Sequence, residues 1–328
     1  MGVLVTGGAG YIGAHVVDAL LGAGRSVVVV DDLSTGRVDR IPGVPVVRLD
    51  VASAAAPGVL ADAFARWDVT AVVHLAARKE VAESFARPEW YHAQNVEGTA
   101  HVLAAMAAAG VPHLVFSSSA AVYGSPDVPS VDEDTPPAPL SPYGTTKLRG
   151  EQLAARATGS GVRSFCLRYF NVAGARSSAL RDDQETNLVT TVLGRLARGE
   201  PPQVNGTDYP TPDGSCVRDL VDVRDVASAH VAALRALEAD TGPVRSEVLN
   251  VGTGTGVSVL EVVRRLCALD GSEVPLQTLP RRTGDPATVV AAVARAQQRL
   301  GWRATHDLDA VLASAWSAAH GEQVSPVR

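Results

Sequence analysis

The sequence predicts an α/β fold in which a doubly wound parallel sheet is joined to a smaller, interleaved α/β lobe. Over the first 170 residues, short valine-rich runs of strand length alternate with segments of helix length. This alternation favours parallel strands joined by right-handed crossovers. The runs also lack a two-residue alternation of apolar and polar side chains, as expected of strands that are buried on both faces.

The expected elements follow one another regularly up to about residue 170. Strands are predicted at 2–7, 26–30, 44–51, 71–77, 113–119 and 162–170. Helices are predicted at 11–23 and 57–67, in a long stretch that ends at Gly110, and from SPYGTTK (141–147) onward. Beyond Asn171 the alternation of strand-length and helix-length segments becomes irregular, and only 217–234 and 247–254 again resemble strands and helices. We therefore predict a first domain of residues 1–170, with 217–234 and 247–254 returning to it, and a second lobe made of 171–216, 235–246 and 255–328.

Composition excludes several classes of protein. Hydrophobic residues make up 46% and charged residues 20% of the chain, as in an ordinary globular protein. The net charge is −6 and there is no basic run, so nucleic acid is not an expected partner. No uncharged apolar run is long enough to cross a membrane, and the N-terminus enters a strand directly, without the pattern of a signal peptide.

The cysteines and histidines give no sign of a disulfide framework or a metal site. The chain has three cysteines, Cys166, Cys216 and Cys267, an odd number without a C-x-x-C pair. This usage indicates a reducing compartment, and we expect the protein to be cytoplasmic. The eight histidines show no paired metal-ligand spacing, so no metal is expected.

The first predicted strand ends in TGGAGYIG, which contains Gly8-x-Gly10-x-x-Gly13 and also Gly7-x-x-Gly10-x-x-Gly13. The pattern alone is weak, but here it follows a strand and opens a helix, which is the context that a Rossmann-type dinucleotide site requires. Glycines allow a tight turn there and let backbone N–H groups approach a pyrophosphate at the positive end of the helix dipole.

Carboxylates follow the second and third predicted strands on the same sheet edge. The pair Asp31-Asp32 begins 18 residues after Gly13, where an acid suits the adenosine ribose hydroxyls of NAD and repels the 2′-phosphate of NADP. Arg37 lies a few residues on and leaves NADP open as the less favoured cofactor. Asp50 either faces the adenine or caps the next helix.

A tyrosine and a lysine stand four residues apart in SPYGTTK, and positions i and i+4 share one face of a helix. Y-x-x-x-K occurs often by chance, so Tyr143 and Lys147 alone do not establish a site. Three serines, Ser117 to Ser119, end a predicted strand on the edge where ligands of such sheets gather. Taken with the downstream Tyr143 and Lys147, this cluster favours a catalytic serine over a simple turn.

The motifs together resemble a known family. The following stretches occur in the family's order and at the family's spacing: TGGAGYIG, Asp31, HLAARKEVAES, SSSAAVYG, SPYGTTK, LRYFNVAGA, GTDYPTPDGSCVRD, LNVGTG and PRRTGD. The chain is similar to the extended short-chain dehydrogenase/reductases and, among them, to the UDP-glucose 4-epimerase family. The resemblance covers nearly the whole chain and implies a nucleotide-sugar 4-epimerase that inverts C4 of a UDP-hexose through a transient 4-keto intermediate, with tightly bound NAD.

The resemblance also implies roles for the catalytic residues. Tyr143 would take the proton of the sugar 4-hydroxyl, Lys147 would stabilise the phenolate, and Ser119 would hydrogen-bond the 4-oxygen. A phenol has an ordinary pKa of ~10. The ammonium and a positive nicotinamide ring would both favour phenolate, so we expect the Tyr143 pKa to be lowered.

The remaining site residues follow from the motifs in the same way. The expected NAD-binding residues are Gly7, Gly10, Tyr11, Ile12, Gly13, Asp31, Asp32, Leu33, Ser34, Asp50, Val51, Leu75, Ala76, Ala77, Lys79, Asn95, Ser117, Tyr143, Lys147 and Phe170. The expected substrate-binding residues are Ser119, Tyr143, Asn171, Asn187, Leu188, Asn205, Arg218, Arg282, Asp285 and Val289. Arginines suit a diphosphate because their forked donors bind phosphate oxygens in pairs.

Absent residues narrow the reaction. Related 4,6-dehydratases carry an Asp-Glu pair directly after the catalytic Thr, and decarboxylating relatives carry a glutamate there, whereas this chain has Ala120 and Ala121 after Ser119. The Ser-Cys pair and downstream His acid of the reductase-epimerases that make GDP-fucose are not seen either. Oxidation and reduction at C4 without elimination therefore fits best.

Three departures from the family pattern leave the sugar open. Asn205 and Val289 stand where relatives usually carry aromatic or bulky residues, and Leu220 replaces a tyrosine. UDP-glucose with UDP-galactose, or the N-acetyl pair, is expected. The alternatives are an NAD-dependent epimerase or oxidoreductase of an unusual nucleotide sugar in a specialised glycosylation pathway, and a silent dinucleotide sensor. The family's dimers suggest a homodimer through the helices of 88–110 and 143–158, although these helices would equally serve to cover the sheet.

Overall fold

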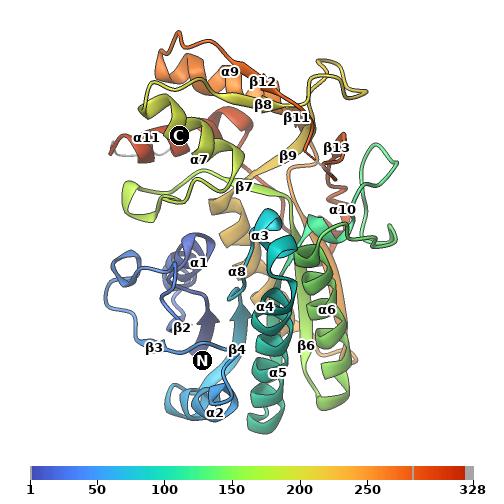
Figure 1. The fold of residues 1–328 in the computed structure, drawn as a ribbon. Helices are drawn as coiled ribbons and strands as arrows, with labels where there is room; N and C mark the ends of the chain where they lie inside the picture. Colours follow the sequence, from blue (N-terminus) through green and yellow to red (C-terminus); the bar gives the residue numbers. More distant parts are fainter. Residues whose placement is uncertain (1, 283, 322–328) are drawn as a thin grey trace.

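The computed structural model describes residues 2–282 and 284–321, and its centre is a seven-stranded parallel sheet (Figure 1). The strand order is β10-β6-β5-β4-β1-β2-β3. The strands are β1 (Gly2–Thr6), β2 (Ser26–Asp31), β3 (Val46–Arg48), β4 (Val69–His74), β5 (His113–Ser119), β6 (Arg163–Tyr169) and β10 (Ser246–Val251). Each overlaps a run that the sequence singled out, although β4 and β10 begin earlier than expected and β3 is much shorter. Strand order reverses between β1 and β4, and ligands of such sheets bind at that point, outside the carboxyl ends of the strands.

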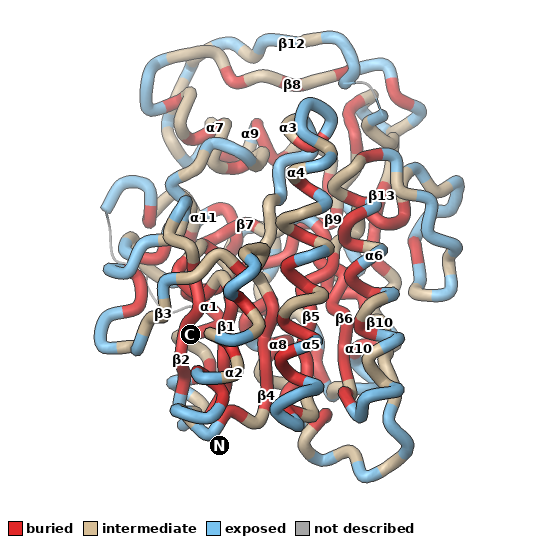
Figure 2. The backbone as a smooth tube through the Cα atoms, turned by 60° about the horizontal axis from the view of Figure 1, so that its bottom comes forward, coloured by how far each residue is buried: buried red, intermediate tan, exposed pale blue. Residues whose placement is uncertain are grey.

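Helices cover both faces of this sheet, as the unalternating apolar strands predict. On β1, Val3 and Val5 belong to one core cluster and Leu4 to the other, because successive side chains point to opposite faces. The first cluster includes apolar residues of α1 (Tyr11–Gly22) and α8 (Val223–Ala239). The second includes residues of α2 (Ala56–Arg66), α5 (Gly98–Ala109) and α6 (Pro142–Arg156). The strands between these layers are the most continuously buried part of the chain (Figure 2).

The long helical stretch predicted to end at Gly110 is interrupted. It consists of α3 (Val81–Ala86), α4 (Pro88–His92), a π-helical segment η2 (Ala93–Glu97) and α5. The break at Arg87 has a local cause, since its φ and ψ are −136° and 50°. A residue before proline is disfavoured in the α region, so the chain leaves the helix at Arg87 and restarts it at Pro88.

The second lobe lies beyond the carboxyl ends of the large sheet (Figure 1). Its strand β9 (Val217–Asp222) pairs with β7 (Asn171–Ala173), β11 (Gly256–Ser258) and β13 (Thr288–Val289). A two-stranded ribbon joins β8 (Gln203–Asn205) to β12 (Gln277–Leu279). The helices of the lobe are α7 (Leu188–Ala197), α9 (Val259–Asp270) and α11 (Leu308–Ala319), and their apolar residues form a core cluster of their own with the strands. Short 3₁₀ turns lie at η1 (Val38–Arg40), η3 (Ala120–Val122), η4 (Ala157–Ser160) and η5 (Ser178–Leu180).

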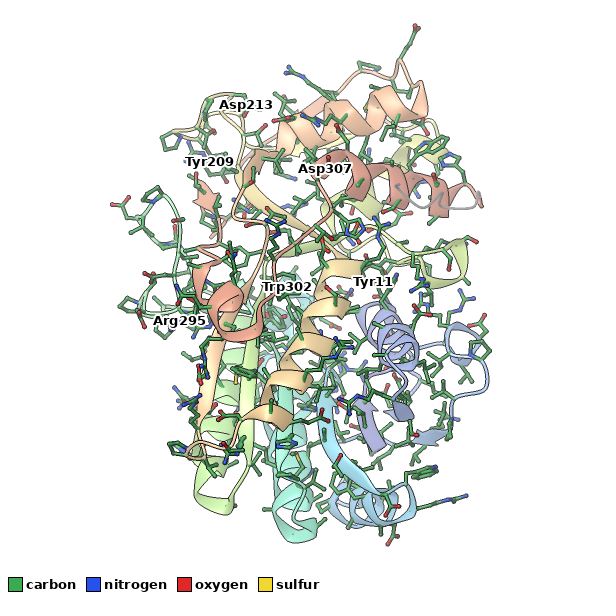
Figure 3. The ribbon with its side chains drawn as sticks, turned by 180° about the vertical axis from the view of Figure 1, so that it is seen from behind. Tyr11, Tyr209, Asp213, Arg295, Trp302 and Asp307 are labelled. Carbon is green, nitrogen blue, oxygen red and sulfur yellow. The ribbon has the colours of Figure 1, made fainter. Side chains whose placement is uncertain are left out.

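The two parts interleave along the chain, but not with the predicted boundaries throughout. Residues 217–234 were expected to return to the large sheet as a unit, whereas β9 lies in the smaller sheet and only α8 packs on the larger one. The chain returns again at α10 (Ala294–Leu300), which packs against α8. Trp302 fixes this return, since its Nε1 donates a hydrogen bond to Ser228 Oγ on α8 at 2.8 Å (Figure 3). In the described ranges, no helix combines the length and apolarity needed to cross a membrane.

Candidate active site

The turn between β1 and α1 is built for close approach by a ligand. Gly7 has φ of 70°, and a Cβ on Gly13 would lie only 2.0 Å from the Gly7 carbonyl oxygen, so neither position tolerates a side chain without strain. Helix α1 starts at Gly10 without a side-chain cap and has no acidic residue in its first turn. Its first N–H groups therefore remain free to hydrogen-bond an anion at the positive end of the helix, which fits the pyrophosphate of a dinucleotide.

The carboxylates at the end of β2 occupy different environments. Asp31 is 6% exposed and accepts hydrogen bonds from the backbone N–H groups of Ala9 at 3.0 Å and Leu33 at 2.9 Å. Burial raises the pKa of Asp31, while these two N–H groups act in the opposite direction. Burial also acts to raise the pKa of Asp32, but its bonds with Ser34 and the nearby Arg78 outweigh burial, and the pKa is lowered. Asp31 is thereby anchored to the glycine turn, with lone pairs left to accept from ribose hydroxyls.

One open cavity of about 380 Å³ runs from these carboxylates to the end of β5. It takes in most of the residues predicted to hold the cofactor, namely Gly7, Gly10, Tyr11, Ile12, Gly13, Asp31, Asp32, Ser34, Asp50, Val51, Leu75, Ala76, Ala77, Lys79, Ser117, Tyr143 and Lys147. Leu33, Asn95 and Phe170 do not line it. Asn95 instead supports a residue of the cavity wall, because its side chain accepts from the Arg78 backbone N–H at 2.8 Å and donates to Thr146 Oγ1 at 2.9 Å.

Close backbone packing brings Ser119 near the start of the helix that carries Tyr143 and Lys147. Ser119 ends β5 and caps η3, with its Oγ accepting from the Ala121 N–H at 3.1 Å. Helix α6 begins beside that turn, capped by Ser141 and started by Pro142. A Cβ on Gly144 would lie 2.6 Å from the Ala121 carbonyl oxygen, so a glycine is needed for α6 to start this close to Ser119.

Lys147 forms its hydrogen bond with the backbone of β5. Its Nζ donates to the Ser117 carbonyl oxygen at 2.8 Å and lies 5.9 Å from the centre of the Tyr143 ring. The side chain is buried, which lowers the pKa of Lys147 to about 8, while Glu151 one turn on acts to raise it. The lysine is thus tied to the strand that carries the serines.

The expected lowering of the Tyr143 pKa is wrong for the protein chain by itself. Burial raises the pKa of the Tyr143 phenol, and a hydrogen bond with Ser119 only partly opposes that rise. The physical reason is that a buried phenolate loses its hydration, while the ammonium of Lys147 is engaged by a carbonyl oxygen rather than by the phenol.

The predicted substrate residues fall into two places in the second lobe. Arg218 forms an ion pair with Asp285, and β13 sets Val289 beside Arg218 in parallel register. Asn205 lies beside Arg282, and with its side-chain amide turned so that the oxygen faces the arginine, that oxygen accepts from Nη2 and Nε of Arg282 at 3.2 and 3.3 Å. Apart from Tyr143, no predicted substrate residue lines the cofactor cavity.

The other predicted substrate residues lie on β7 and at the start of α7. Asn171 pairs with Leu220 between β7 and β9. Asn187 caps α7, accepting at its side chain from the Thr190 N–H at 3.0 Å, and it lines a second cavity of about 270 Å³. Leu188 is the first residue of α7.

The cavity wall includes residues that the sequence did not single out. Arg40 is 6% exposed and donates through Nη2 to Asp183 Oδ1 at 2.7 Å, which brings the loop after η5 to the cavity. Tyr169, Trp90 and Arg78 also line it. Arg78 had a sequence signal, since it directly precedes Lys79 in HLAARKEV, whereas nothing local marked Arg40. In the ranges 2–282 and 284–321, no group of three or more His, Cys, Asp or Glu side chains is arranged to hold a metal ion.

Comparison with known proteins gives a consistent result. Residues 3–252 match the model of the NAD dependent epimerase/dehydratase family. A UDP-glucose 4-epimerase of Azospirillum brasilense is 45% identical over 324 residues, which cover 96% of this chain and 91% of that protein. A solved UDP-glucose-4-epimerase from Stenotrophomonas maltophila, with bound NAD and formylated UDP-arabinopyranose, is 41% identical with a TM-score of 0.90, covering 98% of both chains. The UDP-Glc/GlcNAc 4-epimerase of Campylobacter jejuni is 33% identical with a TM-score of 0.83, covering 97% of this chain and 99% of that one.

Proposed function

The chain belongs to the NAD dependent epimerase/dehydratase family, and from this premise we propose that it is a UDP-hexose 4-epimerase that works with bound NAD. It interconverts UDP-glucose and UDP-galactose by oxidising C4 of the sugar and reducing the 4-keto group from the opposite face. One observation carries the proposal. A single cavity joins the glycine turn and Asp31, which suit a dinucleotide, to Tyr143 and Lys147, which suit proton transfer.

The chain's residues account for the handling of the proton and the sugar. NAD, when bound at the glycine turn and Asp31, would supply the hydride acceptor and donor for C4. We assign to Tyr143 the removal of the 4-hydroxyl proton, and to Ser119 the hydrogen bond that orients the 4-oxygen and the phenol. The phenol starts with a raised pKa, so the positive charge of the nicotinamide and of Lys147 has to offset burial before phenolate forms.

The arginines of the second lobe are proposed to hold the diphosphate. Arg218 is already paired with the Asp285 carboxylate, and Arg282 with the Asn205 amide. A diphosphate is a stronger acceptor than an amide oxygen, so binding would draw Arg282 from Asn205. Asp285 is proposed to accept from the ribose hydroxyls of the nucleotide, and Asn171, Asn187 and Leu188 to contact the rest of the nucleotide sugar.

Val289 supports a wider sugar pocket. It is a small apolar residue, 9% exposed, on the strand beside Arg218. A pocket with valine in place of a bulkier residue leaves room for an N-acetyl group at C2, and the relative from Campylobacter jejuni is described as a UDP-Glc/GlcNAc 4-epimerase. We therefore propose the N-acetyl pair as further substrates.

We also propose a homodimer through the helices of 88–110 and 143–158, and a cytoplasmic location. α5 and α6 lie on the same face of the large sheet, with contacts between them. All three cysteines are free, which suits a reducing compartment. Sedimentation of the purified chain tests the dimer directly.

The experiment for the proposed function has two parts. Protein purified without added cofactor is denatured, and the released dinucleotide is identified; NAD is expected and NADP would count against the assignment. The protein is then incubated separately with UDP-galactose, UDP-GlcNAc and dTDP- and CDP-hexoses, and the products are identified by sugar NMR. Formation of the 4-epimer from a UDP-hexose supports the proposal, whereas NAD-containing protein that forms no 4-epimer from any of them contradicts it.

A further inference from the structure

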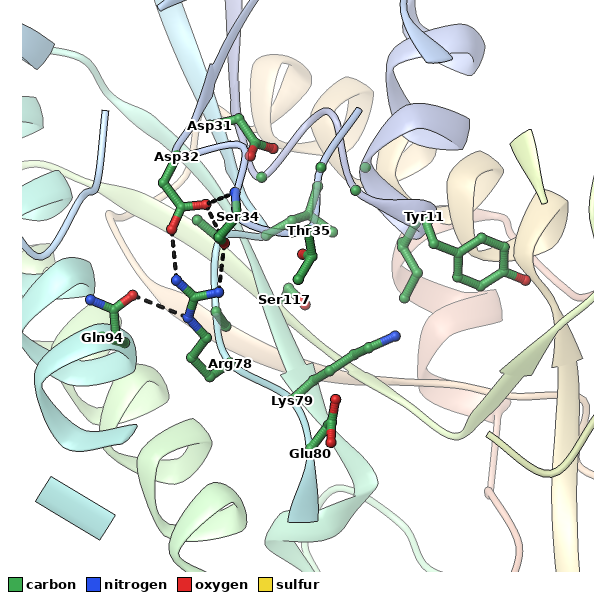
Figure 4. Close-up of a pocket in the computed structure, with 18 of the residues that line it drawn as sticks. Tyr11, Asp31, Asp32, Ser34, Thr35, Arg78, Lys79, Glu80, Gln94 and Ser117 are labelled. Carbon is green, nitrogen blue, oxygen red and sulfur yellow. Dashed lines mark hydrogen bonds and ion pairs between the residues drawn. The ribbon is translucent and has the colours of Figure 1, made fainter. Parts of the chain in front are cut away.

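Arg78 spans the adenosine end of the cofactor cavity. It lies four residues beyond the end of β4, and each nitrogen of its guanidinium has a different partner (Figure 4). Nη2 donates to Asp32 Oδ2 at 2.7 Å and Nη1 to Ser34 Oγ at 2.6 Å. Nε donates to Gln94 Oε1 at 3.3 Å. All three partners line the same cavity as Arg78 itself.

The hydrogen bonds of the Arg78 guanidinium to Asp32, Ser34 and Gln94 form a bridge, which extends to Asp50 after the third strand. The backbone of Arg78 is also held in place by hydrogen bonding. Gln94 donates through Nε2 to the Asp50 carboxylate at 3.1 Å. The Arg78 backbone N–H donates to Asn95 Oδ1 at 2.8 Å, and its guanidinium lies 4.9 Å from the centre of the Trp90 ring. The side chain is only 19% exposed, so these contacts are partly screened from water.

Strand order explains what the bridge crosses. The strands run β4-β1-β2-β3, so a side chain from the loop after β4 reaches the end of β2 only by passing the glycine turn that follows β1. The turn and the bridge border the same cavity, because Gly7, Gly10, Asp31 and Asp50 line it together with Arg78. A dinucleotide with its pyrophosphate at the turn and its adenosine at Asp31 and Asp50 would therefore lie against the bridge.

The geometry points to Arg78 as a latch that holds the adenosine half of NAD in place and slows its release. This inference rests on the proposed function, in which NAD is regenerated in every catalytic cycle and does not have to be released. Release requires the guanidinium to give up its hydrogen bonds to Asp32 and Ser34, and charge-assisted bonds of this kind are the stronger ones. The latch is a property of this chain's own Arg78, Asp32, Ser34 and Gln94, and it is separate from proton transfer at Tyr143.

The test compares Arg78→Met with a matched control, Arg87→Met. Arg87 also stacks on Trp90, at 3.6 Å from the ring centre, and pairs with Glu83, but it does not line the cavity. Both variants and the wild-type chain are purified with their NAD, and the dinucleotide per chain is measured before and after gel filtration. The rate of NAD release is followed by adding an alcohol dehydrogenase and ethanol, which reduce only the NAD that has left.

We expect Arg78→Met to release NAD at least about tenfold faster than the wild-type chain, because it loses a charge-assisted bond and a second bond to a hydroxyl. Arg87→Met is expected to match wild type. Arg78→Lys, which keeps the charge but not the fork, is expected to release NAD faster than wild type. Circular dichroism establishes that each variant is folded before release is measured.

Equal release rates for Arg78→Met and wild type would overturn the latch, even where the melting temperature of Arg78→Met is reduced. Equal acceleration in Arg78→Met and Arg87→Met would also overturn it, because stacking on Trp90 would then be the cause. A wild-type chain that carries no NAD at all would instead refute the cofactor of the proposed function, so the two failures are distinguishable.

Discussion

Tyr143 is half-buried in the wall of the cofactor cavity, and its raised pKa keeps the phenol protonated unless a bound positive charge intervenes. Replacing Tyr143 with phenylalanine removes the hydroxyl and leaves the ring, and we expect kcat to fall by about 10²- to 10⁴-fold, the usual contribution of a general acid–base group. NAD content should not change, since the glycine turn and Asp31 remain. The measurement is initial rate with UDP-galactose, together with dinucleotide per chain.

The control for this variant is Tyr209→Phe. The Tyr209 hydroxyl is buried without a hydrogen-bond partner among the described residues, so its removal should leave the rate and the stability nearly unchanged. Turnover near wild type in Tyr143→Phe would refute every reading in which the phenol is the base.

Lys147 gives a prediction about stability against pH. Its pKa is lowered from 10.5 to about 8 in the folded chain, chiefly by burial. The unfolded chain therefore binds this proton more tightly, and the free energy of unfolding should rise as pH increases from about 8 to 10.5. Below pH 8 the buried charge destabilises the fold by about 3 kcal/mol relative to a neutral amine. A side chain that cannot make the hydrogen bond to Ser117 would lose about 1 kcal/mol of stability in turn.

Lys147→Met should thus be more stable than wild type by about 2 kcal/mol at pH 7, with the advantage shrinking as pH rises. Denaturant unfolding of both chains, freed of dinucleotide, at several pH values from 7 to 10 measures this difference. A constant difference across that range would mean that the lysine has the same pKa in the folded and the unfolded chain, contrary to the lowered value.

Single residues differ in how far the sequence reveals them. Tyr143 and Lys147 could be predicted to share a helix face because spacing on a helix determines which side chains are neighbours. The direction of the Tyr143 pKa shift could not be predicted from the sequence, since it depends on burial by residues distant in the chain. The motif around Lys79 pointed to the neighbourhood of Arg78, but its bond to Asp32 could not be predicted, because the two residues are 46 apart in the chain and meet only through the strand order.

At the scale of elements, α6 is held against β5 by a glycine. A Cβ on Gly150 would lie 2.2 Å from the ring of Phe116, which is 2% exposed and has no room to retreat. Gly150→Ala should therefore destabilise the fold by about 1–3 kcal/mol, as overpacked cores do, and it should lower kcat by displacing Tyr143 and Lys147. Thermal unfolding and initial rates measure the two effects.

Gly58→Ala is the matched control. Gly58 is also a helical glycine, in α2, but nothing lies within 4 Å of its added Cβ. The substitution should stabilise the chain by up to about 1 kcal/mol through helix propensity alone and leave the rate unchanged. Similar effects in the two variants would show that packing on Phe116 does not position α6.

The elements of the large sheet were predictable because a buried parallel strand requires an unbroken apolar run. Helix α1 and helix α6 were predictable from the glycine turn and the Ser-Pro start. The second lobe was not, since β11, β12 and β13 have only two or three residues and are defined by pairing rather than by pattern. The same limit applies to β9, whose apolar run did not reveal which sheet it joins.

In the molecule as a whole, the candidate site lies where the two lobes meet. A small core cluster joins them, combining Val122 and Tyr123 after β5 with Phe170 after β6 and Val289 of the second lobe. Tyr123 strengthens the junction by donating to Asn250 Oδ1 at 2.7 Å, and Asn250 donates to the Val131 carbonyl oxygen at 2.9 Å. The sugar is proposed to bind at this junction. A nucleotide sugar whose diphosphate is held by the arginines can place its sugar at Tyr143 only if the two lobes are rigidly joined.

The stability of the whole molecule in acid should depend on three buried histidines. Burial lowers the pKa of His74 to about 3, and the pKa values of His15 and His230 to about 4. Each ring is bonded at both nitrogens as a neutral group, with His15 Nε2 accepting from the Arg176 N–H at 3.1 Å and His230 Nε2 bonded to the Tyr169 hydroxyl. At His15 a second proton would set a ring N–H against the backbone N–H of Arg176, and at all three rings it would place a charge in a buried site.

Because these folded-state pKa values lie below 6.5, the unfolded chain binds more protons, and the free energy of unfolding should fall as pH drops from 6.5 toward 4. Each histidine contributes about 2 kcal/mol of loss between pH 7 and pH 5. Together they remove about 6 kcal/mol, comparable to the net stability of many domains. His74→Gln should lose about 2 kcal/mol less than wild type over that interval, whatever its stability at pH 7. The exposed His92→Gln should follow wild type, and a His74→Gln slope equal to that of wild type would mean that acid unfolding begins elsewhere in the molecule.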